Sequence, residues 1–253
     1  MTKKRKKTSK FFVFVSFIFT LALTLVIADF CSNFITIKAF SNSNFSNGQN
    51  AYNIYAIALN SATQKTSAME YASTMQKQSA AGFVYEKDNK FYVIASAYSE
   101  LNDANLVKNN LENEGLKPEV IKIEVPAITF ESNHTAPEMN ALVGAVTIYK
   151  TVFDNLYDIS VALDTQVSTE AECFLFVSDV NNLVSKAKLN FEAQFNGNLS
   201  TDILYIKLSL QDLYKKVEDL KNFTQNSTQT FSSKIKSTYL ETISLNINLC
   251  ENL

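Results

Sequence analysis

The sequence predicts an α+β protein, in which a strand-rich unit is followed by a run of helices. Three observations predict this class. A pattern of strand, helix and turn occurs twice between residues 52 and 124, an apolar segment near the start is long enough to cross a membrane, and amphipathic helical spacing begins at residue 135. With 46% hydrophobic and 19% charged residues, the 253-residue chain has enough apolar material for one or two cores.

A basic cluster and an apolar segment open the sequence. Six of the 23 Lys and Arg residues lie within residues 1–10, and residues 11–28 contain no charged side chain. A helix of that length rises about 27 Å, close to the thickness of the hydrocarbon core of a bilayer. The basic cluster predicts a single-pass anchor in the cell membrane, with residues 1–10 in the cytoplasm and the C-terminal part outside. A cleaved signal peptide, cut before Asp29, is the alternative.

The remainder of the chain is acidic, because so much of its positive charge lies in the first ten residues. Nucleic-acid binding depends on neutralising phosphates, so this class of function is excluded. Residues 29–50 are rich in Ser and Asn and bury too little to offset the entropy lost on ordering. They are predicted to be a disordered tether.

Residues 51–125 are predicted to form two similar halves. The expected strands are residues 52–59, 83–85, 91–98 and 120–125, and the expected helices are residues 61–80 and 102–114. Gly82 and Gly115 are expected to end the two helices. Two such halves sharing one antiparallel sheet make a ferredoxin-like βαββαβ unit, with both helices on one face and the other face open.

Alternation along the first and third strands assigns their side chains to two faces. Small or aliphatic residues, which let helices approach closely, occupy one face: Ile54, Ala56, Ala58, Val93, Ala95 and Ala97. The other face mixes rings, hydroxyls and an amide: Asn53, Tyr55, Ile57, Tyr92, Ile94, Ser96 and Tyr98. Aromatic rings flanked by hydrogen-bonding groups suit a sugar chain, so this set predicts a glycan-binding surface. The alternative is that the tyrosines cover the sheet or meet another domain.

The two halves resemble the SPOR domain, the sporulation-related repeat. The resemblance is clearest in residues 91–98, followed by Asp103, Ala104 and residues 111–115, whereas residues 52–59 and 81–83 match more loosely. It covers under a third of the chain. It implies a βαββαβ fold that binds septal peptidoglycan, in particular glycan strands without stem peptides, in bitopic proteins of cell division or sporulation.

The same resemblance implies binding positions at Tyr55, Phe91 and Tyr92. Phe91 conflicts with the alternation, which turns its side chain inward. The sequence also lacks the family's Gly near the strand ends, where Ile57 or Ala58 and Ser96 stand instead.

Residues 126–136 are predicted to be a linker, and residues 137–253 an antiparallel bundle of three or four helices. Thr135 and Glu138 form a capping-box pattern with Pro137 in the first turn. Further helix starts are expected at residues 168–170, at residues 198–201 and from about Asn226. The apolar faces are interpreted as core, and the bundle could still bind another protein.

No catalytic motif is found, so the chain is predicted not to be an enzyme and to need no cofactor or metal. The single histidine, His134, has no evident partner in the sequence. Cys173 and Cys250 could pair outside the cytoplasm, but Cys31 makes the count odd, and no disulfide is expected. Two functions remain open. One is a membrane-anchored peptidoglycan-binding protein of the division or sporulation septum, and the other is an extracytoplasmic scaffold whose bundle binds another protein.

Overall fold

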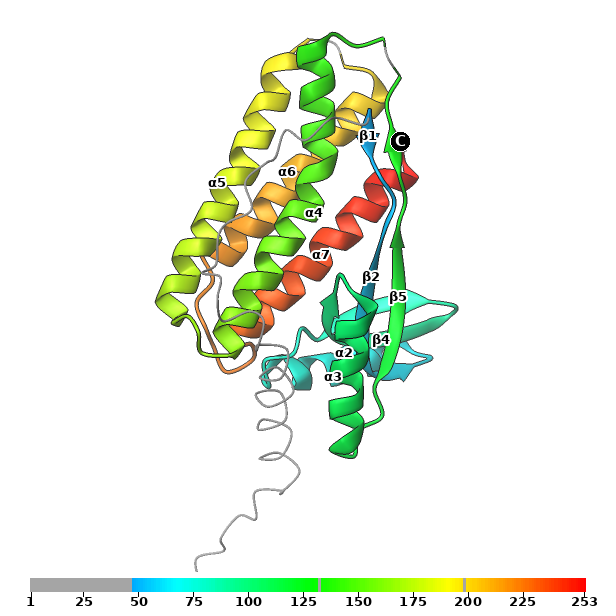
Figure 1. Cartoon of the computed structure of the whole chain (residues 1–253), viewed down its shortest axis with the longest axis vertical. Coiled ribbons are helices and arrows are strands. Elements are labelled where there is room, and N and C mark those ends of the chain that lie inside the picture. The colour runs from blue at the N-terminus through cyan, green and yellow to red at the C-terminus, as the bar shows by residue number, and fades with distance from the viewer. Residues whose placement is uncertain (1–46, 132, 198) are drawn as a thin grey trace, which may run out of the picture.

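The computed structural model describes residues 47–131, 133–197 and 199–253. These residues form a four-stranded antiparallel sheet, a two-stranded ribbon and six helices (Figure 1), which confirms the α+β class. The predicted basic tail, the transmembrane segment at residues 11–28 and most of the tether lie outside these ranges. Within them, no helix combines the length and the apolar character that crossing a membrane requires.

The sheet contains β2 (Tyr52–Ala62), β3 (Phe83–Lys87), β4 (Lys90–Tyr98) and β5 (Glu119–Val125), in the order β3-β4-β2-β5. All neighbouring strands are antiparallel. Asp88 and Asn89 join β3 to β4 with φ angles of 51° and 58°, the left-handed conformation that a two-residue hairpin turn requires. The Lys87 Nζ donates to the backbone carbonyl of Lys122 in β5 at 3.1 Å, so the sheet curls enough for a side chain of one edge strand to reach the other.

A short ribbon extends the sheet at the end where the described chain begins. β1 (Gly48–Gln49) pairs antiparallel with β6 (Ile128–Thr129). A Cβ atom at Gly48 would lie only 1.8 Å from the carbonyl oxygen of Ile128, so this close pairing requires glycine. The predicted linker therefore contains a strand.

Two helices cover one face of the sheet. The buried side chains of α2 (Lys65–Gln76) pack on Val93 and Ala95, and those of α3 (Leu101–Asn113) pack on Ile57 and Tyr98. α3 ends as predicted, with Gly115 at a φ of 85°. α2 ends before the predicted stop at Gly82, and residues 77–82 form a loop in which Ser79 has a φ of 64°.

Four helices form the bundle: α4 (Ala136–Asp164), α5 (Glu170–Gln194), α6 (Thr201–Lys221) and α7 (Phe231–Glu251). Thr135 and Thr169 form capping boxes with Glu138 and Glu172, and Ser200 and Thr230 cap the other two helices with their hydroxyls. The prediction was a bundle of three or four helices, and the structure has four. Consecutive helices run antiparallel through short connections (Figure 1).

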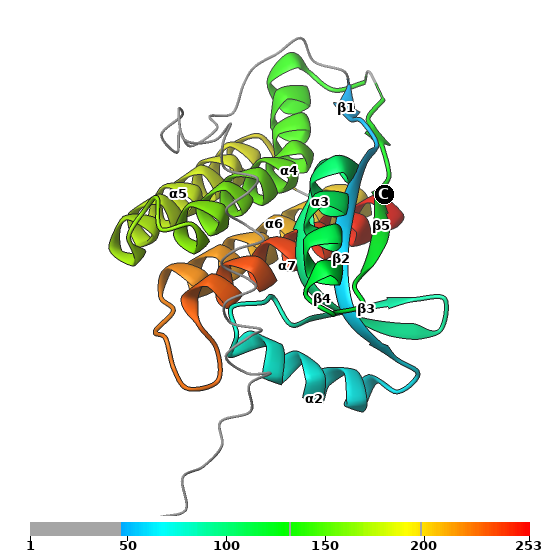
Figure 2. The ribbon, with the colours of Figure 1, turned by 60° about the horizontal axis from the view of Figure 1, so that its bottom comes forward.

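The sheet and the bundle share one core. α4 and α7 pack on the sheet face opposite α2 and α3, whereas α5 and α6 form an outer layer beyond them (Figures 1 and 2). One continuous apolar cluster joins sheet residues such as Ile94 to Phe153 of α4 and Ile243 of α7. The prediction of an open sheet face is therefore wrong, because a second layer of helices covers it.

Candidate functional site

The eight residues predicted to bind glycan do not share one accessible surface. Five of them are between 0 and 7% exposed: Ile57, Tyr92, Ile94, Ser96 and Tyr98. Tyr55 and Phe91 are half-buried, and only Asn53 is exposed. Tyr92 and Ile94 pack with α4 and α7, whereas Tyr55, Ile57 and Tyr98 pack with α3. The alternative interpretation, that these side chains cover the sheet and meet other elements, fits this arrangement.

A β-bulge explains why alternation assigned the faces wrongly. Ile57 pairs with Ser96, but the next residue, Ala58, pairs with Ile94, which leaves Ala95 as an extra residue in β4. Each bulge shifts the following side chains to the opposite face. Tyr92 and Ile94 therefore face the bundle, whereas Ser96 lies on the face of Ile57.

Val93 and Ala95 pack with α2 as expected, whereas the other four residues of the small or aliphatic set, Ile54, Ala56, Ala58 and Ala97, belong to the core shared with the bundle. Ala56 and Ala97 pair across β2 and β4. Beyond the last β3–β4 pair, Phe83 with Ile94, no described strand pairs with β4 on that side, although the Ala81 N–H donates to the Ala95 carbonyl at 2.8 Å. There the Tyr239 hydroxyl of α7 accepts a hydrogen bond from the Ala97 N–H at 3.2 Å.

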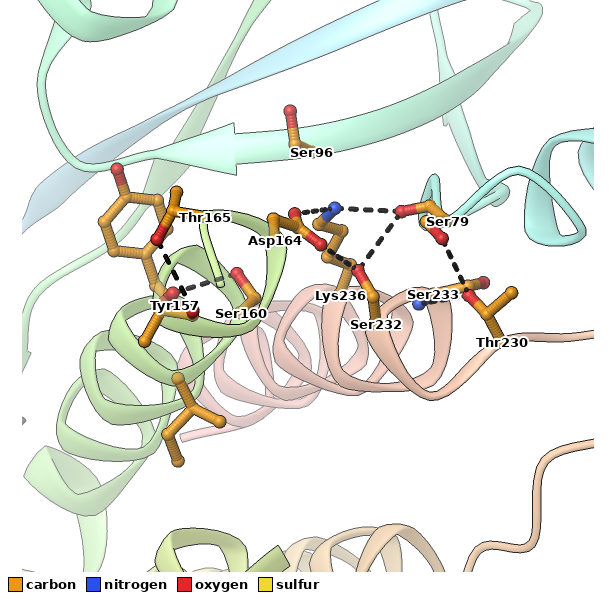
Figure 3. A network of polar contacts seen from close by, with 12 residues as sticks. Ser79, Ser96, Tyr157, Ser160, Asp164, Thr165, Thr230, Ser232, Ser233 and Lys236 are labelled. Atoms are coloured by element: carbon orange, nitrogen blue, oxygen red, sulfur yellow. Dashed lines mark hydrogen bonds and ion pairs between the residues drawn. The ribbon is translucent and has the colours of Figure 1, made fainter. Parts of the chain in front are cut away.

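A buried ion pair ties the bundle to the α2–β3 loop (Figure 3). The Lys236 ammonium of α7 and the Asp164 carboxylate at the end of α4 form the pair, and their side chains are 3% and 10% exposed. Lys236 also donates to the Ser79 backbone carbonyl at 2.8 Å, and the Ser232 hydroxyl donates to Asp164 at 2.5 Å. The Thr230 hydroxyl donates to that of Ser79 at 3.2 Å. Because each charge has a partner and hydrogen bonds, the network can remain inside the fold.

Two spaces adjoin this ion pair. A small cavity of about 20 Å³ lies between Ser96, Tyr98, Tyr157 and the pair, and has room for about one water molecule. On the outer side, a hollow of about 360 Å³ is lined by Lys77, Gln78 and Gln166 among others. The charges around the hollow are mixed, and Lys236 is held by a carboxylate, so the arrangement favours a structural role over proton transfer.

A second hollow, of about 480 Å³, surrounds the only histidine. Its lining includes Glu131, His134 and Asp202, and the imidazole ring packs edge-on to Phe195 at 6.3 Å between ring centroids. In the three described ranges, no three His, Cys, Asp or Glu side chains are grouped so that they could hold a metal ion. His134 is accordingly a packed surface residue.

The two described cysteines are free thiols in different helices. Burial raises the pKa of Cys173 to about 12 and that of Cys250 to about 11. Both thiols are therefore protonated at neutral pH, and the thiol form is a poor nucleophile and a poor metal ligand.

A groove of about 460 Å³ runs between the start of α4 and the end of α5. Small or apolar residues form its floor: Ala141, Gly144, Leu183 and Ala187. Polar residues form its rim: Asn140, Lys186, Asn190 and Gln194. Its volume lies in the range of about 300–1,000 Å³ that is typical of ligand sites.

Sequence reasoning missed Lys236, Asp164 and Tyr239, the polar groups that fasten α7 in place. One signal was present, because Lys236 adjoins Ile235 and lies one helical turn before Tyr239 and Leu240, on a helix whose apolar residues were interpreted as core. For the α4–α5 groove, the only signal in the sequence was the small size of Ala141, Gly144 and Ala187.

No known protein family matches the chain, and neither the curated proteins nor the solved structures contain a match.

Proposed function

We propose that this chain is a membrane-anchored, non-catalytic scaffold whose helical bundle binds another protein outside the cytoplasm. The anchor and the orientation are the expectations drawn from residues 1–28. The bundle is the favoured binding part because the sheet is covered on both faces, whereas α5 and α6 have an outer face free of the rest of the described chain.

One observation carries the proposal, namely the apolar side chains on that outer face. Leu175 and Leu189 of α5 and Leu204 and Leu208 of α6 are between 45 and 67% exposed. Leu175 and Leu189 are 14 residues apart and share one helix face, and Leu204 and Leu208 are one turn apart. Exposed leucines concentrated on one layer are typical of a protein-binding surface.

We infer further that residues 52–125 form a ferredoxin-like unit. The strand order β3-β4-β2-β5, with one helix after the first strand and one after the third, supports this inference. In this proposal the unit is the base on which α4 and α7 are mounted. It is not a separate module, since its core continues into the bundle.

Peptidoglycan binding by the strand residues stays a prediction of the SPOR resemblance, and the burial of Tyr92 beneath the bundle argues against it. Sedimentation of the full chain with amidase-treated peptidoglycan tests this prediction. We expect Tyr55→Ala, which truncates the most accessible of the predicted tyrosines, to sediment like the parent. A strong loss of binding by this folded variant would restore the glycan hypothesis.

Photo-crosslinking tests the scaffold proposal. A photoreactive residue at position 204 or 208 of the full chain, in its own cells, should form an adduct with one defined protein, and one at position 101 should not. Leu101, on α3, is the matched control because it is also an exposed leucine. The captured protein, once purified, should bind the parent chain and the Leu101→Glu variant, and should bind the Leu204→Glu/Leu208→Glu variant at least tenfold more weakly. Equal binding by all three chains would contradict the proposal.

A further inference from the structure

We infer that the partner inserts an amphipathic helix into the α4–α5 groove, with apolar side chains on the groove floor and a carboxylate against Lys186. This inference rests on the proposed scaffold function and names the partner's chemistry.

The absence of side-chain bulk on both walls accounts for the depth of the groove. Ala141 and Gly144 lie one turn apart on α4 and face Ala187 across the groove. Larger residues at these positions would fill the space between the helices, as they do deeper in the bundle, where Val146, Tyr149 and Val184 are fully buried. The open floor therefore offers apolar contact to side chains supplied from outside.

The positive charge of Lys186 on the rim of the groove predicts a negatively charged group on the partner. Lys186 is the one charged residue among those that line the groove. Lys188 is paired with Glu192 at 2.9 Å, whereas the described residues provide no ion-pair partner for Lys186. An unneutralised cation beside an apolar floor is complementary to a carboxylate next to apolar side chains.

The two helices that line the groove indicate that the partner binds as a helix. Both walls are helices, and a groove between two helices accepts the ridge of a third. Exposed Leu189 lies one turn from both Lys186 and Ala193, so it extends the apolar contact beyond the rim on α5. Apolar residues at i and i+4 followed by an acidic residue would meet the floor and Lys186 together, which is the helix-in-groove mode of recognition.

A pair of synthetic helical peptides tests this assignment. Each is alanine-based and carries two leucines four residues apart. One has a glutamate a turn beyond the second leucine, and the other has a lysine at that position. The readout is the fluorescence anisotropy of labelled peptide titrated with the full chain in lipid nanodiscs, against empty nanodiscs, with photo-crosslinks mapped by mass spectrometry.

The glutamate peptide should bind the parent at least tenfold more tightly than the lysine peptide and crosslink to α4 and α5. Lys186→Glu should reverse this preference. Lys215→Glu, the same charge change at an exposed position on α6, should leave the preference within twofold. Unfolding of the Lys186→Glu variant is ruled out if its circular dichroism spectrum and melting temperature match those of Lys215→Glu.

Three results of the peptide experiment would each overturn the inference: no binding of either peptide, a preference that Lys186→Glu does not change, or crosslinks outside α4 and α5. Self-association of the chain that Lys186→Glu abolishes would assign the groove to a second copy and would also overturn the inference. None of these results removes the scaffold proposal, which is tested separately at Leu204 and Leu208.

Discussion

Helices α6 and α7 have the same length, 21 residues, but the helix with the more regular apolar face buries fewer residues. α6 has a regular apolar face and buries six residues, whereas α7 is rich in Ser and Thr and buries 13. The difference lies in position, because α6 is in the outer layer and α7 lies between the sheet, α4 and α6. A high content of Ser and Thr therefore does not mark a helix as exposed.

Two buried threonine hydroxyls of α7 are tolerated because they bond to the helix itself. Thr238 donates to the Lys234 carbonyl at 2.8 Å, and Thr242 donates to the Thr238 carbonyl at 2.9 Å. Such bonds satisfy the hydroxyls without a partner on another element. Small side chains then let α7 approach the sheet closely enough for Tyr239 to reach Ala97.

The largest expected effect on stability is the loss of the buried Lys236–Asp164 ion pair. An exposed ion pair made by α6 provides the comparison. Lys236→Met leaves the Asp164 carboxylate buried without its cation, and we expect a loss of about 3–5 kcal/mol in the free energy of unfolding. Lys216→Met breaks the exposed Lys216–Glu241 pair, 2.7 Å long, and should cost about 1 kcal/mol or less. Urea unfolding followed by circular dichroism measures both. Equal losses would show that the Lys236 network does not fasten α7.

Alkaline pH should weaken the fold next. Burial raises the pKa of Tyr98 to about 12, from an ordinary value of 10.0, against a smaller lowering by its hydrogen bond with Ser96. A phenol with a raised pKa in the folded state stabilises the fold below pH 10, and this contribution is lost as the pH rises from about 10 to 12. We expect a loss of roughly 2–3 kcal/mol across that window, and less in Tyr98→Phe.

Unfolding measured at intervals from pH 8 to pH 12 tests this expectation, with tyrosinate absorbance recorded in parallel. A profile that is the same in Tyr98→Phe and in the parent would show that Tyr98 is not the group responsible.

Removal of single hydroxyls should give the smallest effect. Tyr239→Phe leaves the Ala97 N–H buried without an acceptor, which costs about 1–3 kcal/mol. Tyr205→Phe, in α6, removes an exposed hydrogen bond of 3.4 Å to the Asn248 carbonyl and should change stability by less than about 0.5 kcal/mol. Amide hydrogen exchange at Ala97 should also speed up in Tyr239→Phe alone. Unchanged exchange there would mean that the Tyr239 hydroxyl does not protect this amide.

Local signals made much of the fold predictable. The start of α4 was predicted from the capping box at Thr135, the start of α5 from residues 168–170 and the end of α3 from Gly115, because these signals act within one turn of the chain. The order of strands and helices in residues 52–125 followed from the change between strand and helix periods.

The candidate site was less predictable because it depends on contacts between distant residues. An extra residue in β4 at Ala95 has no local signature, yet it exchanges the faces of Ser96 and Tyr98. An apolar strand face also looks the same whether solvent, a ligand or α7 lies against it. The α4–α5 groove exists because no large side chain fills the space between the two helices. The spacing of residues in the sequence does not show such a gap.

The place of α7 has a consequence for how the chain acquires its structure. α7 follows the sheet, α4, α5 and α6 along the chain. The ribosome therefore synthesises this central helix after the elements that surround it. Until then the part of the apolar sheet face that α7 covers is exposed, and exposed apolar surface makes a folding intermediate prone to aggregate. We therefore expect the nascent chain to remain loose through most of its synthesis and to become compact in one late step, when α7 enters between the layers already made.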